Sequence, residues 1–481
     1  MCMISVPITG HYIDGEWHEE SGSVPVINHA TEEELATIPV ASKTQVNAAL
    51  DAASTAQKSW QNVPGVERAR AIREIGKTVA ASKEAVAQLL LKEQGKPLST
   101  ARGEVAATID LADYVAGWGR RIEGEIVPSD NRDEQIQLQR HPVGVVAAII
   151  PWNYPIGVLM RKLLPALIAG NSLVIKPSSK TPLSTLHLIK QIQEHCDIPT
   201  GLINLLLGDG EVGEALVGSP NTDMVTMTGS TRVGMQIMET AAANLTPVSL
   251  ELGGNAPAIV ASDANIEDAV ADVLRARITN AGQVCTCVER VYVHEAVAEE
   301  FTEKLVAAAQ DLAVGRPEDD PDIGPQISQD ELDWTTQMVE FAVQDGASIQ
   351  IGGQFEEPAY KTGFYYQPTV LADASQEMDV VSEEIFGPVI PVIKVSSLDE
   401  AVTLANDSVY GLSSYLYTQN HRTAMRVSEQ LEYGETYINR SLGEAWQGHH
   451  IGWKKSGLGG DDGKYGVLKY TRIKTVYHDY S

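Results

Sequence analysis

The amino-acid sequence predicts an α/β protein with a parallel, doubly wound sheet and more than one domain. From residue 143 onward, short apolar runs rich in β-branched residues alternate with longer runs that have helical spacing. Strands that are buried on both faces and joined by crossover helices produce this alternation. A second series of the same kind begins near residue 250, and a chain of 481 residues is too long for one ordinary core. Two or three domains are therefore expected.

The N-terminal part is expected to form an edge β region followed by three helices. Within residues 11–40, two short alternating runs flank the turn-forming pair Asp14-Gly15. The next runs are rich in alanine, have helical apolar spacing and contain few breakers. They cover residues 43–60, 64–95 and 97–120. Gly95 marks the expected end of the second helix.

Residues 120–141 interrupt the helical pattern and are predicted to form a projecting hairpin. Two alternating runs, 122–128 and 135–139, are joined by the polar residues 129–131. The C-terminal residues 470–478 alternate as well and are expected to pair with this hairpin. The edge of such a hairpin suits strand addition from another subunit, although an ordinary surface hairpin would have the same pattern.

The first α/β series places four candidate binding loops at one edge of its sheet, because ligands bind beyond the carboxyl ends of parallel strands. The strands are expected at 143–150, 172–175, 202–207 and 224–227, with helices at 155–169, 182–195 and 211–218. The candidate loops are 150–154, 176–180, 208–210 and 228–231. The second series is expected to contain strands at 258–260 and 288–293 and helices at 266–278, 296–313 and 329–345.

Two glycine-rich turns in these loops favour a dinucleotide cofactor. The segment from Gly208 to Gly213 has the spacing G-x-G-x-x-G after a strand, which is a dinucleotide fingerprint in its expected context. The segment 228–234 resembles a nucleoside-triphosphate loop, but Met235 stands where that loop requires lysine. Its Gly229-Ser230 turn still offers backbone N–H groups and a helix N-terminus to a pyrophosphate. Either turn could instead be purely structural.

Cys285 is the candidate nucleophile, in a loop between the expected helix at 266–278 and the expected strand at 288–293. A ligand can reach a cysteine in such a loop, and a thiolate is a strong nucleophile once its pKa is lowered. The alternative is an inert thiol, since free cysteine is usually buried. Cys287 lacks the spacing of a thioredoxin-like or zinc motif, so no metal is expected and packing beside the loop is its expected role.

Two residues elsewhere have the chemistry that a cysteine nucleophile requires. Glu251 lies in an apolar run that ends in Gly253-Gly254, where partial desolvation would raise its pKa and make it a general base near neutral pH. Asn153 lies between Pro151 and Pro155, and its amide could donate to a developing oxyanion. The alternatives are a solvent-facing Glu at a strand end and an ordinary Asn turn.

Three further residues could contact a nucleotide. Lys176 follows a predicted strand and could reach a ribose hydroxyl or a phosphate. In the loop 383–388, Glu384 could bind a ribose and Phe386 could brace a flat ring. Loop packing would explain these residues equally well.

Taken in order, these residues resemble the motifs of the aldehyde dehydrogenase superfamily over nearly the whole chain. The motifs are Asn153 in Pro-Trp-Asn, Lys176-Pro-Ser, Thr228-Gly229-Ser230, Glu251-Leu-Gly-Gly, Gly282-Gln283-x-Cys285 and Glu384-x-Phe386-Gly-Pro. The resemblance implies a Rossmann-type cofactor domain at 1–119 and 142–250, an α/β catalytic domain at 251–450 and a small β oligomerisation flap at 120–141 and 465–481. It also implies a homo-oligomer, expected to be a tetramer.

The same resemblance implies roles for individual residues. Cys285 would be the nucleophile and Glu251 the general base. Asn153 and the backbone N–H of Cys285 would form the oxyanion hole. NAD or NADP would bind at Ile150, Pro151, Trp152, Lys176, Ser178, Ser179, Gly208, Gly213, Gly229, Ser230, Leu252, Glu384 and Phe386.

Within the superfamily the chain is most similar to the dehydrogenases of lactaldehyde and glycolaldehyde, in the segments 285–293, 434–440 and 444–457. In that group a small hydroxy acid is held by the residues that match Arg161, Glu444 and His450. Arginine can bind a carboxylate, whereas Glu and His can bond a 2-hydroxyl. Two positions depart from the pattern of relatives. Thr286, an expected substrate contact, replaces the usual Asn, and Ser179 replaces the Glu that NAD-preferring members usually carry.

The implied reaction is the irreversible oxidation of a small 2-hydroxyaldehyde to its carboxylate through a cysteine thioester. Three alternatives are open: a CoA-acylating relative, a succinate- or 2-oxoglutarate-semialdehyde dehydrogenase, and a non-catalytic binding protein on the same fold. Glu251 argues against the first, because a CoA-acylating enzyme needs no water-activating base. The complete catalytic set argues against the third. Arg161 would serve the distal carboxylate of a semialdehyde equally well.

The composition excludes several other classes of partner. Asp and Glu number 64 and Lys and Arg 36, so the formal net charge is −28 and the chain would repel nucleic acid and anionic membranes. No apolar run reaches the length of about 18 residues that spans a membrane. The N-terminus lacks the basic and apolar regions of a signal peptide. Four scattered cysteines, including Cys2 and Cys196, indicate a reducing compartment. A cytoplasmic protein is expected.

The dispersed negative charge also predicts adaptation to concentrated salt, because a solvated acidic surface keeps a protein soluble there. A plain acidic cytoplasmic enzyme is the alternative, since net charge alone speaks to solubility and not to habitat. Measuring activity from low salt to molar KCl distinguishes the two. We expect activity to be retained or raised in molar KCl, and a salt optimum near zero would contradict the prediction.

Overall fold

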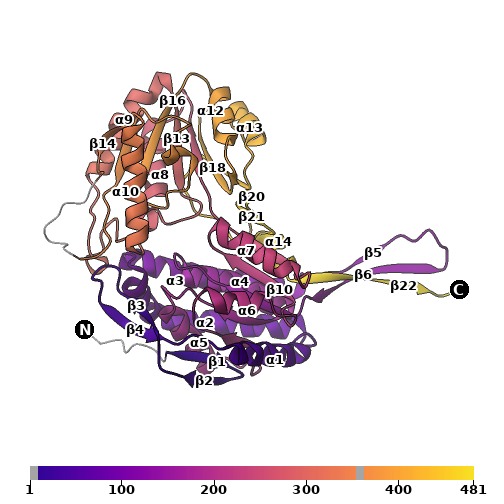
Figure 1. Ribbon diagram of the computed structural model, residues 1–481. Helices are drawn as coiled ribbons and strands as arrows, with labels where there is room; N and C mark the ends of the chain where they lie inside the picture. The colour runs from indigo at the N-terminus through magenta and orange to yellow at the C-terminus, as the bar shows by residue number, and fades with distance from the viewer. Residues whose placement is uncertain (1–8, 354–361) are drawn as a thin grey trace.

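The computed structural model describes residues 9–353 and 362–481 and contains two large sheets and a projecting ribbon (Figure 1). Residues 1–8 lie outside the described part. They include Cys2 and the stretch in which no signal peptide was expected. Within the described part, no helix is both long and apolar enough to cross a membrane.

The first sheet has eight strands in the order β2-β1-β9-β8-β7-β10-β11-β21. Its centre is parallel, as predicted, and consists of β9 (Ile203–Leu205), β8 (Ser172–Lys176), β7 (Val145–Ile149), β10 (Met224–Thr228) and β11 (Val248–Glu251). The expected N-terminal hairpin, β1 (Gly10–Ile13) and β2 (Glu16–Glu19), forms one antiparallel edge. The two-residue strand β21 (Gly457–Leu458) forms the other.

Helices cover both faces of this sheet, which confirms the doubly wound prediction. They are α1 (Lys43–Trp60), α2 (Gly65–Gln94), α3 (Leu98–Ala116), α4 (Pro155–Ala169), α5 (Leu183–His195), α6 (Gly210–Val217) and α7 (Thr231–Ala242), with a 3-10 helix, η1 (Gly117–Arg120), after α3. Successive residues of a strand point to opposite faces. Accordingly, Val146 and Ala148 pack with residues of α2 to α5, whereas Val145 and Ala147 pack with residues of α1, α6 and α7. Gly95 ends α2 in a left-handed conformation (φ 85°), as expected.

The second sheet has seven strands in the order β14-β15-β16-β13-β12-β18-β19, all parallel except the edge strand β14. The strands are β12 (Ala256–Val260), β13 (Val288–His294), β14 (Ser348–Ile351), β15 (Thr369–Ala372), β16 (Val389–Val395), β18 (Ser413–Tyr417) and β19 (Glu435–Ile438). The helices are α8 (Ile266–Ile278), α9 (Glu295–Gln310), α10 (Gln329–Gln344), α11 (Asp379–Ser382), α12 (Leu398–Asn406) and α13 (His421–Gln430). The shorter pieces are η2 (Thr279–Gly282), η3 (Pro317–Asp319), β17 (Tyr410–Gly411) and β20 (Trp453–Lys454).

The chain crosses between the two sheets twice, and both crossings lie near the candidate site. Glu251 ends β11 in the first sheet, and β12 begins the second sheet only five residues later, at Ala256. After β19 the chain returns to the first sheet, where β21 pairs with β11. There the N–H of Leu252 donates to the Ser456 carbonyl at 2.8 Å. The helix α14 (Gly463–Leu468) then packs against α4.

The projecting ribbon consists of three antiparallel strands, β5 (Glu125–Val127), β6 (Glu134–Pro142) and β22 (Thr471–Asp479). It extends away from the body with the C-terminus at its tip (Figure 1). The predicted pairing of the C-terminal residues with the 120–141 hairpin is confirmed by the β22–β6 register, from Thr471 opposite Pro142 to Asp479 opposite Glu134. A smaller hairpin, β3 (Val24–Ile27) with β4 (Glu34–Ile38), completes the N-terminal β region.

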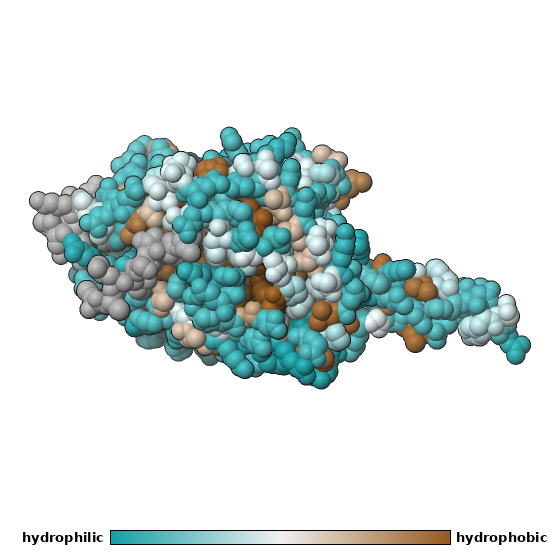
Figure 2. Space-filling model, turned by 90° about the horizontal axis from the view of Figure 1, so that it is seen from below, coloured by the Kyte–Doolittle hydropathy of each residue, from teal (hydrophilic) through white to brown (hydrophobic). Residues whose placement is uncertain are grey.

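The ribbon exposes large apolar side chains. They are Ile126, Ile473, Tyr477 and Tyr480, each more than half exposed. Figure 2 shows a mostly hydrophilic face of the body, with hydrophobic spots along the ribbon that projects from it. Exposed apolar side chains grouped on one projection are typical of a surface that another chain covers.

Candidate active site

A cavity of about 190 Å³ opens between the two sheets and brings together residues from five loop segments and from the helix α10. It is lined by Pro151, Trp152, Asn153, Thr228, Gly229, Ser230, Leu252, Gly253, Cys285, Glu331, Trp334, Glu384, Ile385 and Phe386. Nine of the residues singled out from the sequence are in that set: Pro151, Trp152, Asn153, Gly229, Ser230, Leu252, Cys285, Glu384 and Phe386. Ile150, Lys176, Ser178, Ser179, Gly208 and Gly213 lie outside this lining, at the carboxyl ends of neighbouring strands or in the helix that follows.

A left-handed turn places Cys285 at the cavity. Asn280 (φ 52°), Ala281 (φ 57°) and Gly282 (φ 79°) are all left-handed, and this run ends the helical segment that follows α8. A Cβ at Gly282 would lie 2.4 Å from the Gly387 carbonyl oxygen, so glycine is required there. Cys285 emerges partly exposed. Cys285 is therefore not a fully buried thiol, and its role as nucleophile stays a prediction.

Hydrogen bonds fix this turn to both halves of the molecule. Gln283 donates from Nε2 to the Asn280 carbonyl at 2.8 Å and accepts at Oε1 from the Ile327 N–H at 2.9 Å. Asn153, from the loop after β7, donates from Nδ2 to the Gln283 carbonyl at 3.0 Å. An amide nitrogen carries two hydrogens, so one remains for another acceptor in the cavity.

A buried ion pair that the sequence did not reveal supports the Asn153 loop. Lys96 pairs with Glu104 and donates from Nζ to the Asn153 carbonyl at 2.9 Å. Glu104 Oε1 also accepts from the N–H groups of Ile156 and Gly157, both at 2.9 Å. Both charged side chains are almost completely buried. Charged residues such as these stand out only because they are buried. The sequence alone does not show which charged residues are buried, so this pair could not be predicted.

Glu251 is buried at the end of β11, so the solvent-facing alternative is wrong. Its exposure is 1%, and neither carboxylate oxygen accepts a hydrogen bond from any described residue. Burial raises the pKa of Glu251 to about 7, opposed by the charge of His450, whose Nε2 lies 3.7 Å from Glu251 Oε2. A carboxyl with this pKa can take up and release a proton near neutral pH.

The residues expected to hold the substrate surround His450. Its Nδ1 lies 3.2 Å from Glu435 Oε1 and 3.9 Å from Glu444 Oε1. The carbonyl of Thr286 accepts from the Tyr415 hydroxyl at 2.5 Å. Sequence reasoning gave no role to Glu435. The only signal was an acidic residue at the start of an apolar strand.

Arg161 has a partner that the sequence did not predict. Its Nη2 lies 3.0 Å from Asp462 Oδ2, and its guanidinium lies 5.3 Å from the centre of the Trp446 ring. Burial raises the pKa of Asp462 to about 6, which Arg161 opposes. The carboxylate-binding group predicted from sequence is thus already paired with a carboxylate of this chain.

The cofactor side of the cavity has the groups that a nicotinamide dinucleotide needs. Ser230 caps α7, accepting from the Val233 N–H at 3.4 Å, and Gly229 leaves the approach to that helix N-terminus open. The Trp152 and Phe386 rings lie edge to face, with their centres 5.5 Å apart. Glu384 Oε1 accepts from the Gly254 N–H at 2.8 Å, and burial raises the pKa of Glu384 to about 8. The helix N-terminus at Ser230 suits a phosphate, the Trp152 and Phe386 rings suit a flat ring, and Glu384 suits ribose hydroxyls.

The second glycine turn is less suited to phosphate. Asp209 caps α6 by accepting from the Glu211 N–H at 3.0 Å, so a carboxylate already stands at that helix N-terminus. Gly213 of α6 packs along the side chain of Lys176. The Lys176 Nζ donates to the Pro177 carbonyl at 3.3 Å. Burial lowers the pKa of Lys176 to about 8, opposed by Asp209. The phosphate expectation therefore depends on the turn at 228–230.

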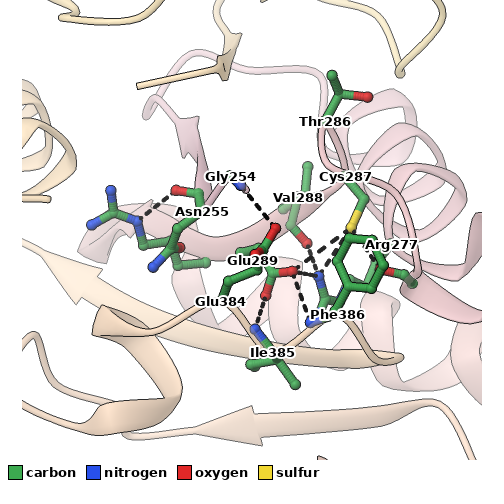
Figure 3. Close-up of polar contacts among 12 residues, drawn as sticks. Gly254, Asn255, Arg277, Thr286, Cys287, Val288, Glu289, Glu384, Ile385 and Phe386 are labelled. Atoms are coloured by element: carbon green, nitrogen blue, oxygen red, sulfur yellow. Dashed lines mark hydrogen bonds and ion pairs between the residues drawn. The ribbon is translucent and has the colours of Figure 1, made fainter. Parts of the chain in front are cut away.

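A second buried ion pair connects the Cys285 loop to the Glu384 loop (Figure 3). Arg277 Nη1 lies 2.6 Å from Glu289 Oε1 and 3.1 Å from Cys287 Sγ. The Glu289 carboxylate accepts from the N–H groups of Ile385 at 3.2 Å and Phe386 at 3.3 Å. Cys287 is fully buried, as expected, and also donates to the Gly282 carbonyl at 3.2 Å.

The arrangement of a partly exposed thiol and a cavity between two α/β sheets can be compared with known protein families. The model of the Aldehyde dehydrogenase family matches residues 17–476. The chain belongs to the aldehyde dehydrogenase family. As a member of it, this protein is an oxidoreductase that uses NAD or NADP, and the fold predicted from the resemblance is confirmed.

Several relatives of this aldehyde dehydrogenase are similar over their whole length. The lactaldehyde dehydrogenase of Escherichia coli K12 is 44% identical, over 98% of this chain and 99% of that protein. Its crystal structure superposes with a TM-score of 0.95. The 3,6-anhydro-alpha-L-galactose dehydrogenase of Vibrio sp. EJY3 is also 44% identical, over 97% of this chain and 98% of that protein. The D-glyceraldehyde dehydrogenase (NADP(+)) of Picrophilus torridus is 39% identical, over 98% and 96%.

The Lys96–Glu104 pair generates a prediction about stability. Glu104→Gln keeps an acceptor for Ile156 and Gly157 but leaves the buried ammonium of Lys96 unpaired. Removing one partner of a buried pair costs about 3–5 kcal/mol. We expect a loss of this size in the free energy of unfolding, measured by urea denaturation followed by circular dichroism.

The matched control is Glu84→Gln, which breaks the exposed pair between Glu84 of α2 and Arg102 of α3. That change should leave the denaturation midpoint within error, because exposed pairs contribute little. Equal midpoints for the two variants would contradict the role given to Glu104.

Proposed function

We propose that the protein oxidises a small 2-hydroxyaldehyde, such as lactaldehyde or glycolaldehyde, to its carboxylate. The observation that carries the proposal is the set of polar groups beside Cys285. Glu444 and His450 lie there, and both can bond a 2-hydroxyl. The relatives named above act on lactaldehyde, 3,6-anhydro-alpha-L-galactose and D-glyceraldehyde, which supports a hydroxylated aldehyde.

In the proposed mechanism Cys285 Sγ attacks the aldehyde carbon, forming a C–S bond. The resulting oxyanion accepts hydrogen bonds from Asn153 Nδ2 and from the Cys285 N–H. The nicotinamide cofactor, when bound, supplies the hydride acceptor, and Ser230, Glu384 and Phe386 would hold it. Glu251 then takes a proton from water, whose oxygen attacks the thioester carbon and releases Cys285.

The surroundings of Arg161 disfavour the semialdehyde alternative. A distal carboxylate of succinate or 2-oxoglutarate semialdehyde would have to displace Asp462 from Arg161. It would also meet Glu444, whose charge already acts on the same arginine. Two carboxylates brought to the same buried arginine would repel each other. A neutral hydroxyaldehyde avoids both costs.

A panel of aldehydes tests the proposed substrate class. We expect kcat/KM to be highest for lactaldehyde or glycolaldehyde and clearly lower for succinate semialdehyde, followed by the absorbance of NAD(P)H. A preference for succinate semialdehyde would overturn the substrate class while leaving the family membership intact. A requirement for CoA in the same assay would support the acylating alternative.

Two variants separate the roles of Cys285 and Glu251. Cys285→Ala should abolish turnover and leave cofactor binding, measured by fluorescence titration, unchanged. Glu251→Gln should keep the first burst of NAD(P)H and slow the hydrolysis that follows, because only the carboxylate can accept the proton of water. A burst from the Cys285→Ala variant would refute the assignment of the nucleophile.

The pKa of Glu251 near 7 sets the expected pH dependence of hydrolysis. Above this pH the carboxylate is free to act as base, and below it the protonated form accumulates. Single-turnover hydrolysis of the thioester should therefore slow as pH falls through about 7. A rate that is flat across this range would contradict the role of Glu251.

We further propose that NADP is accepted alongside NAD. The support is Ser179, which lacks the charge with which a glutamate would repel a 2′-phosphate. The neighbouring Lys180 would add positive charge near a 2′-phosphate, although its Nζ already donates to Ser328 Oγ at 3.1 Å. Steady-state kcat/KM for both cofactors tests the proposal. A preference for NAD of about a hundredfold, equivalent to 2.7 kcal/mol, would contradict it.

The domain division given above and the assembly are proposals as well. The exposed apolar side chains of the ribbon support its use as an oligomerisation flap in a homo-oligomer, with a tetramer expected. A monomer by multi-angle light scattering would rule this out. The three described cysteines are free thiols, which supports a reducing, cytoplasmic setting, and the salt series above tests halophilic adaptation.

A further inference from the structure

Arg161 lies on the one face of α4 that is not buried. Gly157 and Arg161 are the only residues of this helix outside its buried set, and their spacing of four places them on the same face. Tyr154, the partly buried residue that precedes α4, continues this face towards Asn153. Asn153 lines the cavity together with Cys285. The open face of α4 therefore runs from the cavity to Arg161.

The pair of Arg161 with Asp462 is fixed beside the residues expected to hold the substrate. Asp462 follows Asp461, whose backbone exchanges two hydrogen bonds with that of His450, at 2.7 and 3.0 Å. The Arg161 guanidinium also stands over the ring of Trp446, which lies in the same loop as His450. The charge of Arg161 is therefore directed at this loop and not at the outer surface.

Asp462 neutralises the charge that Arg161 would offer to a ligand. Among the described residues, no other carboxylate forms an ion pair with this arginine, and the exposure of the Asp462 side chain is only 2%. The neighbouring Asp461 is held by Lys162 and Lys469 instead. Burial raises the pKa of Asp462 to about 6, so its carboxyl is mainly ionised at neutral pH.

The pair leaves hydrogen-bonding groups of Arg161 unused. Its Nη2 lies 3.0 Å from Asp462 Oδ2, but the two groups are not aligned as a hydrogen bond. The buried Nε of Arg161 likewise has no hydrogen-bond partner among the described residues. A guanidinium can bind a carboxylate through two parallel N–H bonds. Arg161 could therefore bind a better-aligned carboxylate once the charge of Asp462 is removed.

The backbone of Asp462 indicates that its side chain serves the site more than the fold. Its φ of 59° and ψ of 170° lie in a region that residues with a side chain rarely adopt. A glycine at this position would remove the strain. Strained residues other than glycine persist where the surroundings fix them, and they concentrate at functional sites.

We propose that Asp462 is a specificity-determining residue that occupies Arg161 in place of a substrate carboxylate and restricts the site to uncharged aldehydes. An aldehyde with a distal carboxylate, such as succinate semialdehyde, would meet the charge of Asp462 instead of a free guanidinium. A charge arranged against the wrong ligand is a common source of specificity. The inference rests on the proposed function and extends it by naming the residue that sets the substrate class.

The first experiment compares the wild-type enzyme with Asp462→Asn, which keeps the size of the side chain and removes its charge. kcat/KM is measured with NAD for succinate semialdehyde and for glycolaldehyde, from the absorbance of NADH. We expect the ratio of the two values, semialdehyde over glycolaldehyde, to rise at least about tenfold in the variant. An unchanged ratio would overturn the proposal.

Binding of succinate provides a second readout, which needs no turnover. Each protein is titrated with succinate, a stable dicarboxylate, in a calorimeter at neutral pH. We expect succinate to bind at least about tenfold more tightly to Asp462→Asn than to the wild-type enzyme. Failure of every aldehyde in the panel would reject the proposed function and leave this titration intact, whereas equal affinities would reject the role of Asp462 alone.

Two control variants separate the pair from a general effect of charge. In the double variant Arg161→Gln/Asp462→Asn the guanidinium is lost as well, so both gains should disappear. Glu435→Gln removes a carboxylate that lies 3.2 Å from His450 and does not pair with Arg161, so it should change the ratio far less. A gain that survives in the double variant, or an equal gain in Glu435→Gln, would contradict the proposal.

Asp462→Gly covers the case in which the asparagine variant does not fold. Glycine adopts the backbone conformation of this position without strain and removes the same carboxylate. Circular dichroism checks the fold, and the same gains in the kcat/KM ratio and in succinate affinity are expected. A folded Asp462→Gly variant with the ratio and affinity of the wild-type enzyme would refute the proposal.

Discussion

The hydrogen bond from Asn153 Nδ2 to the Gln283 carbonyl is the contact on which the candidate site depends. It joins the loop after β7 in the first sheet to the Cys285 loop, which precedes β13 in the second sheet. Asn153 can face the cavity only because Lys96 and Glu104 hold its loop, and Gln283 is in place only because Ile327 and Asn280 hold its amide. The position of Cys285 relative to the Asn153 amide is thus a property of both sheets together.

The site is built around buried carboxyl groups with few compensating cations. Glu251 and Glu384 both have raised pKa values, and both gain them chiefly from burial. Such groups are costly to bury as anions. Their retention at the junction of the sheets is therefore evidence for function, because a stable core alone would not require them. The second buried ion pair, Arg277 with Glu289, extends this network to the loop that would contact the cofactor.

The sequence predicted the parts of this protein that depend on local pattern. The N-terminal hairpin, the helices and the pairing of the C-terminal strand follow from turn chemistry and periodicity. The ordered motifs pointed to Cys285, Glu251 and Asn153, and the structure places Cys285 and Asn153 in one cavity. The missed residues have remote partners. Glu104 contacts Ile156, 52 residues away, and Glu289 contacts Ile385, 96 residues away. From the sequence, Arg161 was likewise expected to be free to bind a substrate carboxylate. Its partner Asp462 is 301 positions away, and the two meet only because α4 and the residue before α14 lie together in the fold.

The closing of the first sheet by the last part of the chain affects how the protein is made. β21 pairs with β11, and Arg140 of the ribbon bonds Thr471, 331 residues later in the sequence. During synthesis, the edge of β11 in the first sheet and the edge of β6 in the ribbon therefore leave the ribosome before their partners. Both edges stay open until β21 and β22 emerge, and contacts between such distant residues form slowly. The sheet edge beside Glu251 is thus completed only after the whole second sheet has been made.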